Sequence, residues 1–256
     1  MQTSEIPSAP AVAHGRPHAP ASTGHLAGFL AIGVLIVALG MLAQHRPTAE
    51  GAGNELAKHG QAISLYVSAI VLDWLLFFYC LRGVRRSGGR LRDFLGDDAL
   101  SRRSWLSDLL VAVPFWFLWN GTGWGLHRLL DALPGLAKSG AVRTVDSLLP
   151  QTPEEALLWV LVCLTAGFCE EFAFRGYLQR QFHARAGNAT LAVIGQGVVF
   201  GLFHAYQGWQ SVLVISALGI LFGILAQWRR NLRANMIVHA WADLWSGWLK
   251  AIVWVA

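Results

Sequence analysis

Ionisable side chains interrupt apolar stretches in the C-terminal half of this 256-residue chain. They form three groups, which are Glu170 and Glu171 with Arg175, then Phe200 with His204, and finally His239 with Asp243. Charged groups are costly inside an apolar helix, so they are functional candidates by default. Glutamate and histidine can both exchange protons with water near neutral pH when their surroundings are tuned. The three groups therefore indicate hydrolytic chemistry.

Spacing along a helix separates the roles of the two adjacent glutamates. Glu171 and Arg175 are four residues apart with the acid first, which is the favoured order for a helical ion pair. Glu170 lies about 100° further around the helix, so Arg175 cannot easily serve both acids. We therefore predict a supporting ion pair between Glu171 and Arg175, and we predict that Glu170 is left for chemistry.

The depth of His204 in the membrane is predicted to match that of Glu170. If the two helices turn at Gly187-Asn188, each residue lies about 16–17 positions, or roughly 25 Å, from the turn. The face that carries His204 also carries Gly197, Phe200 and Gly201. Small residues there are expected to let the Glu170 helix approach closely.

His239 and Asp243 are four residues apart, and so they lie on one face of the last helix. A carboxylate in that position can accept a hydrogen bond from one imidazole nitrogen and direct the other nitrogen toward a site. We therefore expect Asp243 to orient His239.

Seven apolar runs surround these residues, and each is long enough to cross a bilayer, which takes about 20 residues. They are 24–44, 62–81, 104–126, 154–180, 189–207, 211–228 and 234–255. The 104–126 run is the weakest, because it contains Pro114 and ends in a glycine-rich segment. Only 14% of the residues are charged, against about a quarter in soluble domains. The expected fold class is all-α, a polytopic membrane helical bundle of about seven transmembrane helices.

The composition also predicts how the chain is organised. Residues 1–22 are rich in Ala, Pro, His and Ser, without periodicity, which is typical of a disordered tail. Residues 23–150 hold the first three predicted helices and their loops, among them a 127–153 segment of unassigned role. Residues 151–256 hold every ionisable group described above and form the predicted catalytic helical core.

The loop charges predict an orientation in the membrane. Arginines gather in the 82–104 loop, around Arg180 and Arg185, and in the 229–233 turn, which lie on one side if all seven runs cross. The positive-inside rule makes that side, and the N-terminus, cytoplasmic. The rule also accounts for the net charge of +5, so no nucleic-acid partner is expected. Membrane lipids are the expected surroundings, and the Ala, Gly and Arg content favours a bacterial cell (inner) membrane.

The three motifs together resemble those of one known family. EEFAFR at 170–175, FGLFH at 200–204 and HAWAD at 239–243 resemble, in order and spacing, the motifs of the CPBP family, also called the CAAX protease and bacteriocin-processing or Abi family. The resemblance covers about 154–255 and implies an intramembrane glutamic endopeptidase, similar to the type II CAAX prenyl endopeptidases. It implies that Glu170 and His204 activate water, while His239 and the residue at 243 stabilise the oxyanion.

Several alternatives share the same residues. Glu170, His204 and His239 could instead hold zinc, as two histidines and one carboxylate do elsewhere, although the H-E-x-x-H spacing is absent. A non-catalytic membrane immunity or scaffold protein is a second alternative. A transporter is a third, although no repeated half is evident. We expect no cofactor, a membrane-associated peptide or protein as substrate, and a structural partner for Asp73 in the second run.

Substitution at position 243 tests the role expected for Asp243. An ionised aspartate cannot donate a hydrogen bond to an oxyanion, whereas an asparagine amide can. Asp243→Asn is expected to keep appreciable proteolytic activity and Asp243→Ala to lose much of it, measured as cleavage rates of purified variants. An Asn variant as inactive as the Ala variant would contradict the orienting role.

Overall fold

The computed structural model describes residues 20–44, 55–96, 101–133 and 149–253, and within these ranges every regular element is helical. The predicted all-α fold is confirmed. The elements are α1 (Thr23–Gln44), α2 (Glu55–Arg86), α3 (Arg92–Leu95), α4 (Arg102–Ala132), α6 (Pro153–Glu171), the π-helical segment η1 (Phe172–Leu178), α7 (Gln179–Ala186), α8 (Ala189–Phe203), the 3-10 turn η2 (Ala205–Gln207), α9 (Trp209–Arg229) and α10 (Arg233–Val253).

Four helical stretches are long and apolar enough to cross a membrane by length and composition. They are Thr23–Leu42, His59–Arg86, Pro153–Ala186 and Trp209–Arg229, while Ala189–Phe203 is apolar but shorter. Within the described residues each of the seven predicted runs is largely helical, with a break at His204, and the count of seven spans stays a prediction. Large apolar side chains such as Val34, Leu110 and Leu157 are 65–70% exposed. Apolar surfaces of this kind fit lipid contact and an integral membrane protein.

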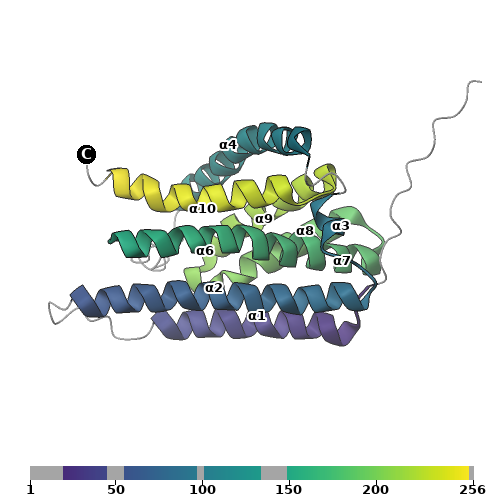
Figure 1. Cartoon of the computed structure of the whole chain (residues 1–256), viewed down its shortest axis with the longest axis horizontal. Helices are drawn as coiled ribbons and strands as arrows, with labels where there is room; N and C mark the ends of the chain where they lie inside the picture. The colour runs from purple at the N-terminus through teal and green to yellow at the C-terminus, as the bar shows by residue number, and fades with distance from the viewer. Residues whose placement is uncertain (1–19, 45–54, 97–100, 134–148, 254–256) are drawn as a thin grey trace, which may run out of the picture.

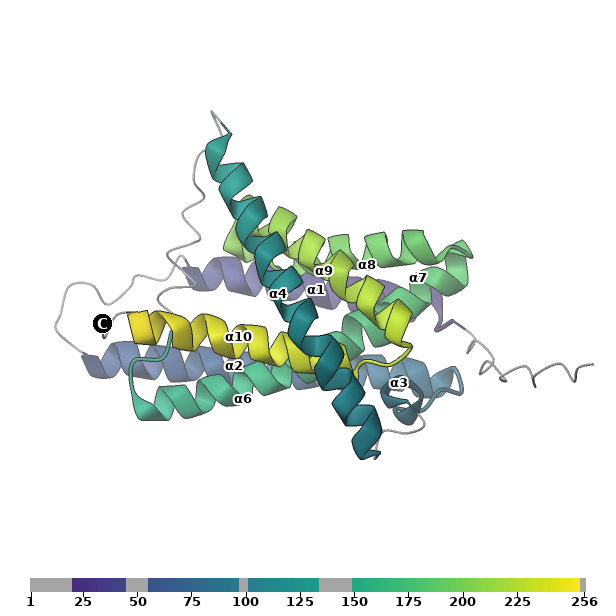
Figure 2. The same ribbon diagram turned by 90° about the horizontal axis from the view of Figure 1, so that it is seen from above.

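The predicted 104–126 run ends later than expected. Helix α4 continues through Pro114 and through the glycine-rich segment as far as Ala132. It crosses the other helices diagonally (Figure 2). The beginning of the predicted 127–153 loop is therefore helical. Residues 134–148, and residues 1–19 of the predicted tail, lie outside the described residues.

Helix α6 lies at the centre of the bundle, with α2 on one side and α10 on the other (Figure 1). Its start is defined by Thr152, whose Oγ1 accepts a hydrogen bond from Glu155 N, with proline next in the chain. The main core joins α1, α2, η1 and α8 through buried aromatic rings, including Phe29, Phe77 and Phe174. These contacts hold the α6–η1 segment, which carries both glutamates, between fixed neighbours.

The predicted hairpin turn is present between α7 and α8. Gly187 ends α7 with a positive φ of 63°, a conformation that costs glycine little. Asn188 caps α8, because its side-chain oxygen accepts a hydrogen bond from Leu191 N at 3.0 Å. The sequence pair Gly-Asn therefore both stops one helix and starts the next.

Gly197 and Gly201 of α8 do not face the Glu170 helix, and this prediction was wrong. A Cβ atom on Gly197 would lie 2.8 Å from Ile220 N, and one on Gly201 would lie 2.5 Å from Val212 O, both in α9. From α9, Gly219 faces Gly197 in return. The spacing grouped Gly197 and Gly201 on one face of α8, but which neighbouring helix that face meets depends on long-range packing. The small residues allow α8 and α9, rather than α8 and α6, to approach closely.

The arginine-bearing loops meet at one end of the bundle, as expected. Arg233 donates to the carbonyl oxygen of Leu95 at 2.7 Å and to buried Asp108 at 2.5 Å. Arg180 donates to the carbonyl oxygen of Asp93 at 3.3 Å. These contacts join α3 to α4, to α7 and to the start of α10. Whether this end faces the cytoplasm stays a prediction.

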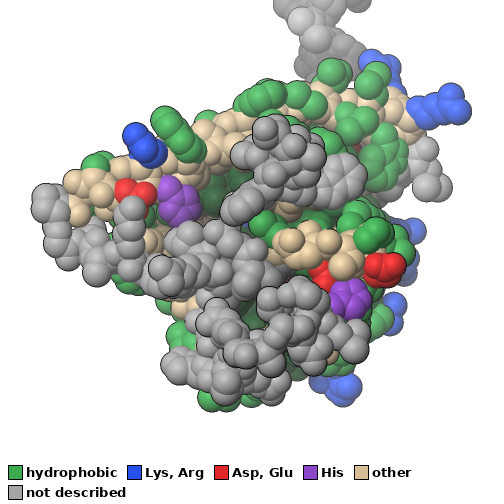
Figure 3. All heavy atoms as spheres, turned by 90° about the vertical axis from the view of Figure 1, so that its left-hand side faces the viewer, with side chains coloured by type: hydrophobic (Ala, Val, Ile, Leu, Met, Phe, Trp, Pro, Cys, Tyr) green, Lys and Arg blue, Asp and Glu red, His purple; other side chains and the backbone are tan. Residues whose placement is uncertain are grey.

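The opposite end has a different polar contact. His59 of α2 and Glu155 of α6 form an ion pair at 2.7 Å. Figure 3 faces this end, where histidine and acidic side chains occur in two small groups among hydrophobic ones. The two helices are therefore joined near their N-terminal ends as well as through the core.

Adding one methyl group at the α8–α9 contact tests this packing. Gly201→Ala is expected to lower stability by about 1–3 kcal/mol, because backbone atoms of α9 leave no room for the new Cβ. Gly121→Ala is the matched control, since a Cβ atom there meets nothing within 4 Å. Thermal unfolding of the detergent-purified proteins measures both. Equal melting temperatures for Gly201→Ala and the wild type would contradict the packing described.

Candidate active site

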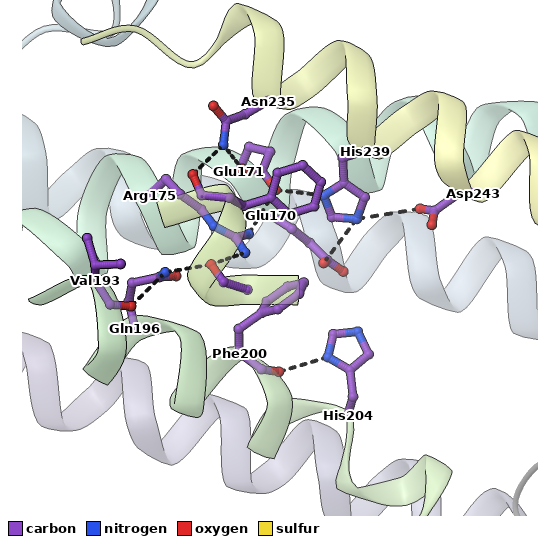
Figure 4. Close-up of polar contacts among 12 residues, drawn as sticks. Glu170, Glu171, Arg175, Val193, Gln196, Phe200, His204, Asn235, His239 and Asp243 are labelled. Atoms are coloured by element: carbon purple, nitrogen blue, oxygen red, sulfur yellow. Dashed lines mark hydrogen bonds and ion pairs between the residues drawn. The ribbon is translucent and has the colours of Figure 1, made fainter. Parts of the chain in front are cut away.

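The carboxylate of Glu171 is the centre of a buried polar network (Figure 4). Its Oε1 accepts hydrogen bonds from Arg175 Nη1 at 2.8 Å and from His239 Nδ1 at 2.7 Å. Its Oε2 accepts one from Asn235 Nδ2 at 3.2 Å. Three donors from two elements therefore satisfy one carboxylate, and the predicted Glu171–Arg175 ion pair is present.

The guanidinium of Arg175 lies in a cage of aromatic rings. Its central carbon is 4.3 Å from the ring centroid of Phe200 and 5.0 Å from that of Phe222. Its Nη2 donates to the carbonyl oxygen of Gly219 at 3.3 Å. A buried cation is tolerated only with such partners. The arginine thus joins η1 to α8 and α9.

The imidazole of His239 is held in one orientation. Its Nδ1 donates to Glu171, an ionised acid beside Arg175, so this nitrogen carries a proton. The opposite nitrogen, Nε2, faces Glu170 Oε2 at 3.8 Å and Asp243 Oδ2 at 3.5 Å. The hydrogen bond that orients the ring therefore comes from Glu171, whereas the sequence led us to expect it from Asp243.

Glu170 differs from its neighbour Glu171. Its Oε2 is buried and has no hydrogen-bond partner among the described residues. Its side chain is 19% exposed, against 0% for Glu171. A buried polar atom without a partner is unusual and is often found at a functional site. Glu170 is thus the acid of the two whose oxygen lacks a hydrogen-bond partner, while its role in chemistry stays a prediction.

His204 lies just beyond the end of α8, across from the other groups (Figure 4). Its Nδ1–H donates to the carbonyl oxygen of Phe200 at 2.8 Å, since a carbonyl oxygen can only accept. In the neutral ring, Nε2 then has a lone pair that can accept a proton. The Phe200 ring contacts both imidazoles, with centroids 4.8 Å from His204 and 6.1 Å from His239.

The predicted residues are therefore gathered unequally. Glu170 and Asp243 lie together at Nε2 of His239, while His204 is related to them only through the Phe200 ring, which lies close to both imidazoles. No hydrogen bond or ion pair joins His204 to Glu170 in the described part of the chain. The catalytic roles of all four residues stay predictions.

Two residues of this site were missed or misjudged. Asn235, which holds the second oxygen of Glu171, precedes His239 by four residues, just as Asp243 follows it by four. That repeated spacing was a signal in the sequence. Asp73 was expected to have a structural partner, but it has no hydrogen bond or ion pair within the ranges described. It instead interacts electrostatically with Glu170 and the His239–Asp243 pair.

The described residues do not form the zinc site that the sequence left open as an alternative. Over residues 20–44, 55–96, 101–133 and 149–253, no three His, Cys, Asp or Glu side chains are grouped so that they could hold a metal ion. Glu170 and His239 are neighbours, but no hydrogen bond or ion pair among the described residues joins His204 to either of them. Metal dependence is a matter for experiment.

The comparison with protein families agrees with the motifs. Residues 152–245 match the family model described as Type II CAAX prenyl endopeptidase Rce1-like. The matched segment runs from the cap of α6 to Trp245 in α10, so it includes all three motifs and confirms the CPBP resemblance. The Rce1-like family is one of proteases, which supports a CAAX-type intramembrane protease. No curated protein and no solved structure matches the chain.

Removing one partner of the buried ion pair tests the network. Arg175→Met is expected to destabilise the protein by about 3–5 kcal/mol, because the Glu171 charge is left without its partner. The double variant Glu171→Gln, Arg175→Met removes both charges and is expected to recover most of that loss. Thermal unfolding of purified variants makes the comparison. If the single variant is as stable as the double, the pair does not have the electrostatic role assigned to it.

Proposed function

We propose that the chain is an endopeptidase that hydrolyses a peptide bond of a membrane-associated protein or peptide with water activated by Glu170 and His204. The observation that carries the proposal is the contrast between the two adjacent glutamates within a Rce1-like segment. Glu171 is saturated by three donors, while Glu170 has a buried oxygen without a partner. Of the two glutamates, only Glu170 therefore has an oxygen available to accept a proton.

The first step is attack of water on the substrate carbonyl. Glu170 takes one proton from the water, and the water oxygen forms a bond to the carbonyl carbon as the C=O π electrons move to oxygen. Nε2 of His204 accepts a hydrogen bond from the other hydrogen of the same water molecule. The unpartnered Glu170 oxygen and the Nδ1–H bond of His204 to Phe200 both support these roles.

The second step is stabilisation and collapse of the oxyanion. Glu171 holds one nitrogen of His239, so a protonated ring presents its Nε2–H to the developing negative charge. Asp243, close to the same nitrogen, favours that protonated ring. When the C–N bond breaks, Glu170 returns the proton to the leaving nitrogen. The products are a carboxylic acid and an amine.

An apolar groove in the protein is evidence for a hydrophobic substrate. It has a volume of about 550 Å³ and is lined by side chains of α4, α6 and α10, including Val113, Leu164 and Trp241. Val238 and Ala240, the chain neighbours of His239, also line it. A prenyl group or an apolar peptide segment suits such a surface. We propose that the reaction takes place in a bacterial cell (inner) membrane, with the arginine-rich end of the bundle in the cytoplasm.

Replacing Glu170 tests the function without knowledge of the substrate. Membranes containing the wild type or Glu170→Gln are compared by mass spectrometry for peptide termini that depend on the protein. Glu170→Gln is expected to lower their formation by about 10²–10⁴-fold, because the amide cannot accept the proton from water. Glu154→Gln, at an exposed position in the first turn of α6, is the control and is expected to match the wild type.

The same assay separates the alternative functions. If peptide termini form to the same extent with Glu170→Gln as with the wild type, the endopeptidase proposal is wrong and a scaffold role is favoured. A chelator arm, with metal content of the purified protein measured in parallel, tests the zinc alternative. Full cleavage by protein without stoichiometric metal is expected under the proposal, whereas loss that zinc restores would overturn the water activation described.

A further inference from the structure

Two aromatic rings lie close to the imidazole of His204. The ring of Tyr206, in η2, is stacked on it, with the centroids 6.2 Å apart and an interplanar angle of 27°. The ring of Phe200, in α8, meets the same imidazole edge-on, at 4.8 Å and 63°. Aromatic rings at such distances attract one another in both arrangements. The plane of the His204 ring is therefore restricted by one neighbour on each side of it in the chain.

The backbone that carries His204 leaves the helix at this point. Helix α8 ends at Phe203, and His204 has a φ of −98° and a ψ of 13°. The three residues that follow form the 3-10 turn η2, in which Gln207 N donates to the carbonyl oxygen of His204 at 2.8 Å. So short a turn has few backbone hydrogen bonds of its own. Its position therefore depends on the elements that pack against it.

Helix α1 packs against this turn, although it lies outside the segment that matches the family model. A Cβ atom on Gly40 would lie 2.8 Å from Cγ of Tyr206, so the ring rests on the backbone of α1. Gly33 lies against the Phe203 ring in the same way, and Phe29 stacks on that ring at 5.4 Å. One face of α1 thus contacts the residue before His204 and the residue two positions after it.

The orientation of the His204 ring in this setting suits a proton acceptor. Its Nδ1–H donates to the carbonyl oxygen of Phe200 at 2.8 Å, so Nε2 carries no proton in the neutral ring. Figure 4 shows the side chain extending from the end of α8 toward Glu170 and His239. Rotation of the ring would break the hydrogen bond to Phe200 and turn Nε2 away from that direction.

We propose that Tyr206 is a positioning residue of the candidate site. Its ring, packed against Gly40 of α1, limits the rotation of the His204 imidazole and so preserves the hydrogen bond from Nδ1 to Phe200. Helix α1 thereby contributes to the site through the turn that follows α8. The meaning of this inference for catalysis rests on the proposed endopeptidase function, whereas the held orientation of the imidazole does not.

Nitrogen-15 NMR of the purified full chain, labelled at histidine, tests the orientation without any substrate. The His204 signals are identified by their loss in His204→Ala. At a pH where the ring is neutral, the wild type is expected to show a proton on Nδ1 and none on Nε2. Gly40→Ala is expected to displace Tyr206 and to give signals averaged between the two tautomers. Gly24→Ala, in the same helix, is the matched control, since a Cβ atom there meets nothing within 4 Å.

Two substitutions at Tyr206 distinguish positioning by the ring from a general loss of packing. Tyr206→Leu keeps an apolar side chain but removes the ring, and is expected to give averaged His204 signals. Tyr206→Phe removes only the hydroxyl group, which accepts a hydrogen bond from Gln207 Nε2 at 3.1 Å, and is expected to recover the wild-type tautomer. Thermal unfolding is measured in parallel. If Tyr206→Leu folds poorly, Gly40→Ala makes the same test with the tyrosine in place.

Cleavage kinetics test the consequence for catalysis. The substrate is a synthetic peptide that spans a terminus found in the membrane comparison. Gly40→Ala and Tyr206→Leu are expected to lower kcat by up to about 10²-fold, because a small misplacement of a reacting group slows the chemical step. Neither residue lines the apolar groove, so KM is expected to change little. Tyr206→Phe is expected to recover most of the lost kcat.

The outcomes separate this inference from the proposed function. His204 signals that stay the same in Gly40→Ala and Tyr206→Leu would overturn the positioning role, and so would Tyr206→Phe signals as averaged as those of Tyr206→Leu. A raised KM with an unchanged kcat would also contradict it. Averaged signals in the first two variants that Tyr206→Phe restores, in a protein that cleaves nothing, would support the positioning role while the endopeptidase proposal fails.

Discussion

The buried ion pair between Glu171 and Arg175 is the constraint on which the rest of the structure depends. Neither side chain is exposed, so each charge must be satisfied inside the protein. The partners that satisfy them come from several elements: Asn235 and His239 from α10, the Gly219 carbonyl from α9, and the Phe200 ring from α8. An interaction between two residues one turn apart therefore fixes four helices relative to one another.

The same constraint gives two neighbouring glutamates opposite properties. Three donors bind Glu171, whereas Glu170 has a buried oxygen without a hydrogen-bond partner among the described residues and lies 3.8 Å from His239 Nε2. One acid is thus fully satisfied, while an oxygen of the next has no hydrogen-bond partner among the described residues. Because Glu171 also orients the His239 ring, a change at this supporting residue affects the geometry of the site as well as stability.

Features of the site that depend on local spacing could be predicted from the sequence, whereas features that depend on long-range packing could not. The Glu171–Arg175 pair and the turn at Gly187-Asn188 depend on neighbours in the chain, so both could be predicted. The helix that Gly197 faces could not, because it depends on how α8 packs against α9. The π-helical turn at Phe172–Leu178 also escaped prediction. It interrupts the 3.6-residue period on which spacing arguments rest, and nothing in the apolar sequence marks it.

The aromatic contact between α2 and α6 has a consequence for how the protein can be divided. Tyr66 and Phe77 cover a face of α6 that belongs to the Rce1-like segment, although α2 itself does not. A fragment limited to residues 152–245 would leave that face bare and would also lose the nearby carboxyl group of Asp73. The domain defined by sequence likeness is therefore smaller than the autonomous unit, and grafting it onto another scaffold would require a substitute for the missing helix.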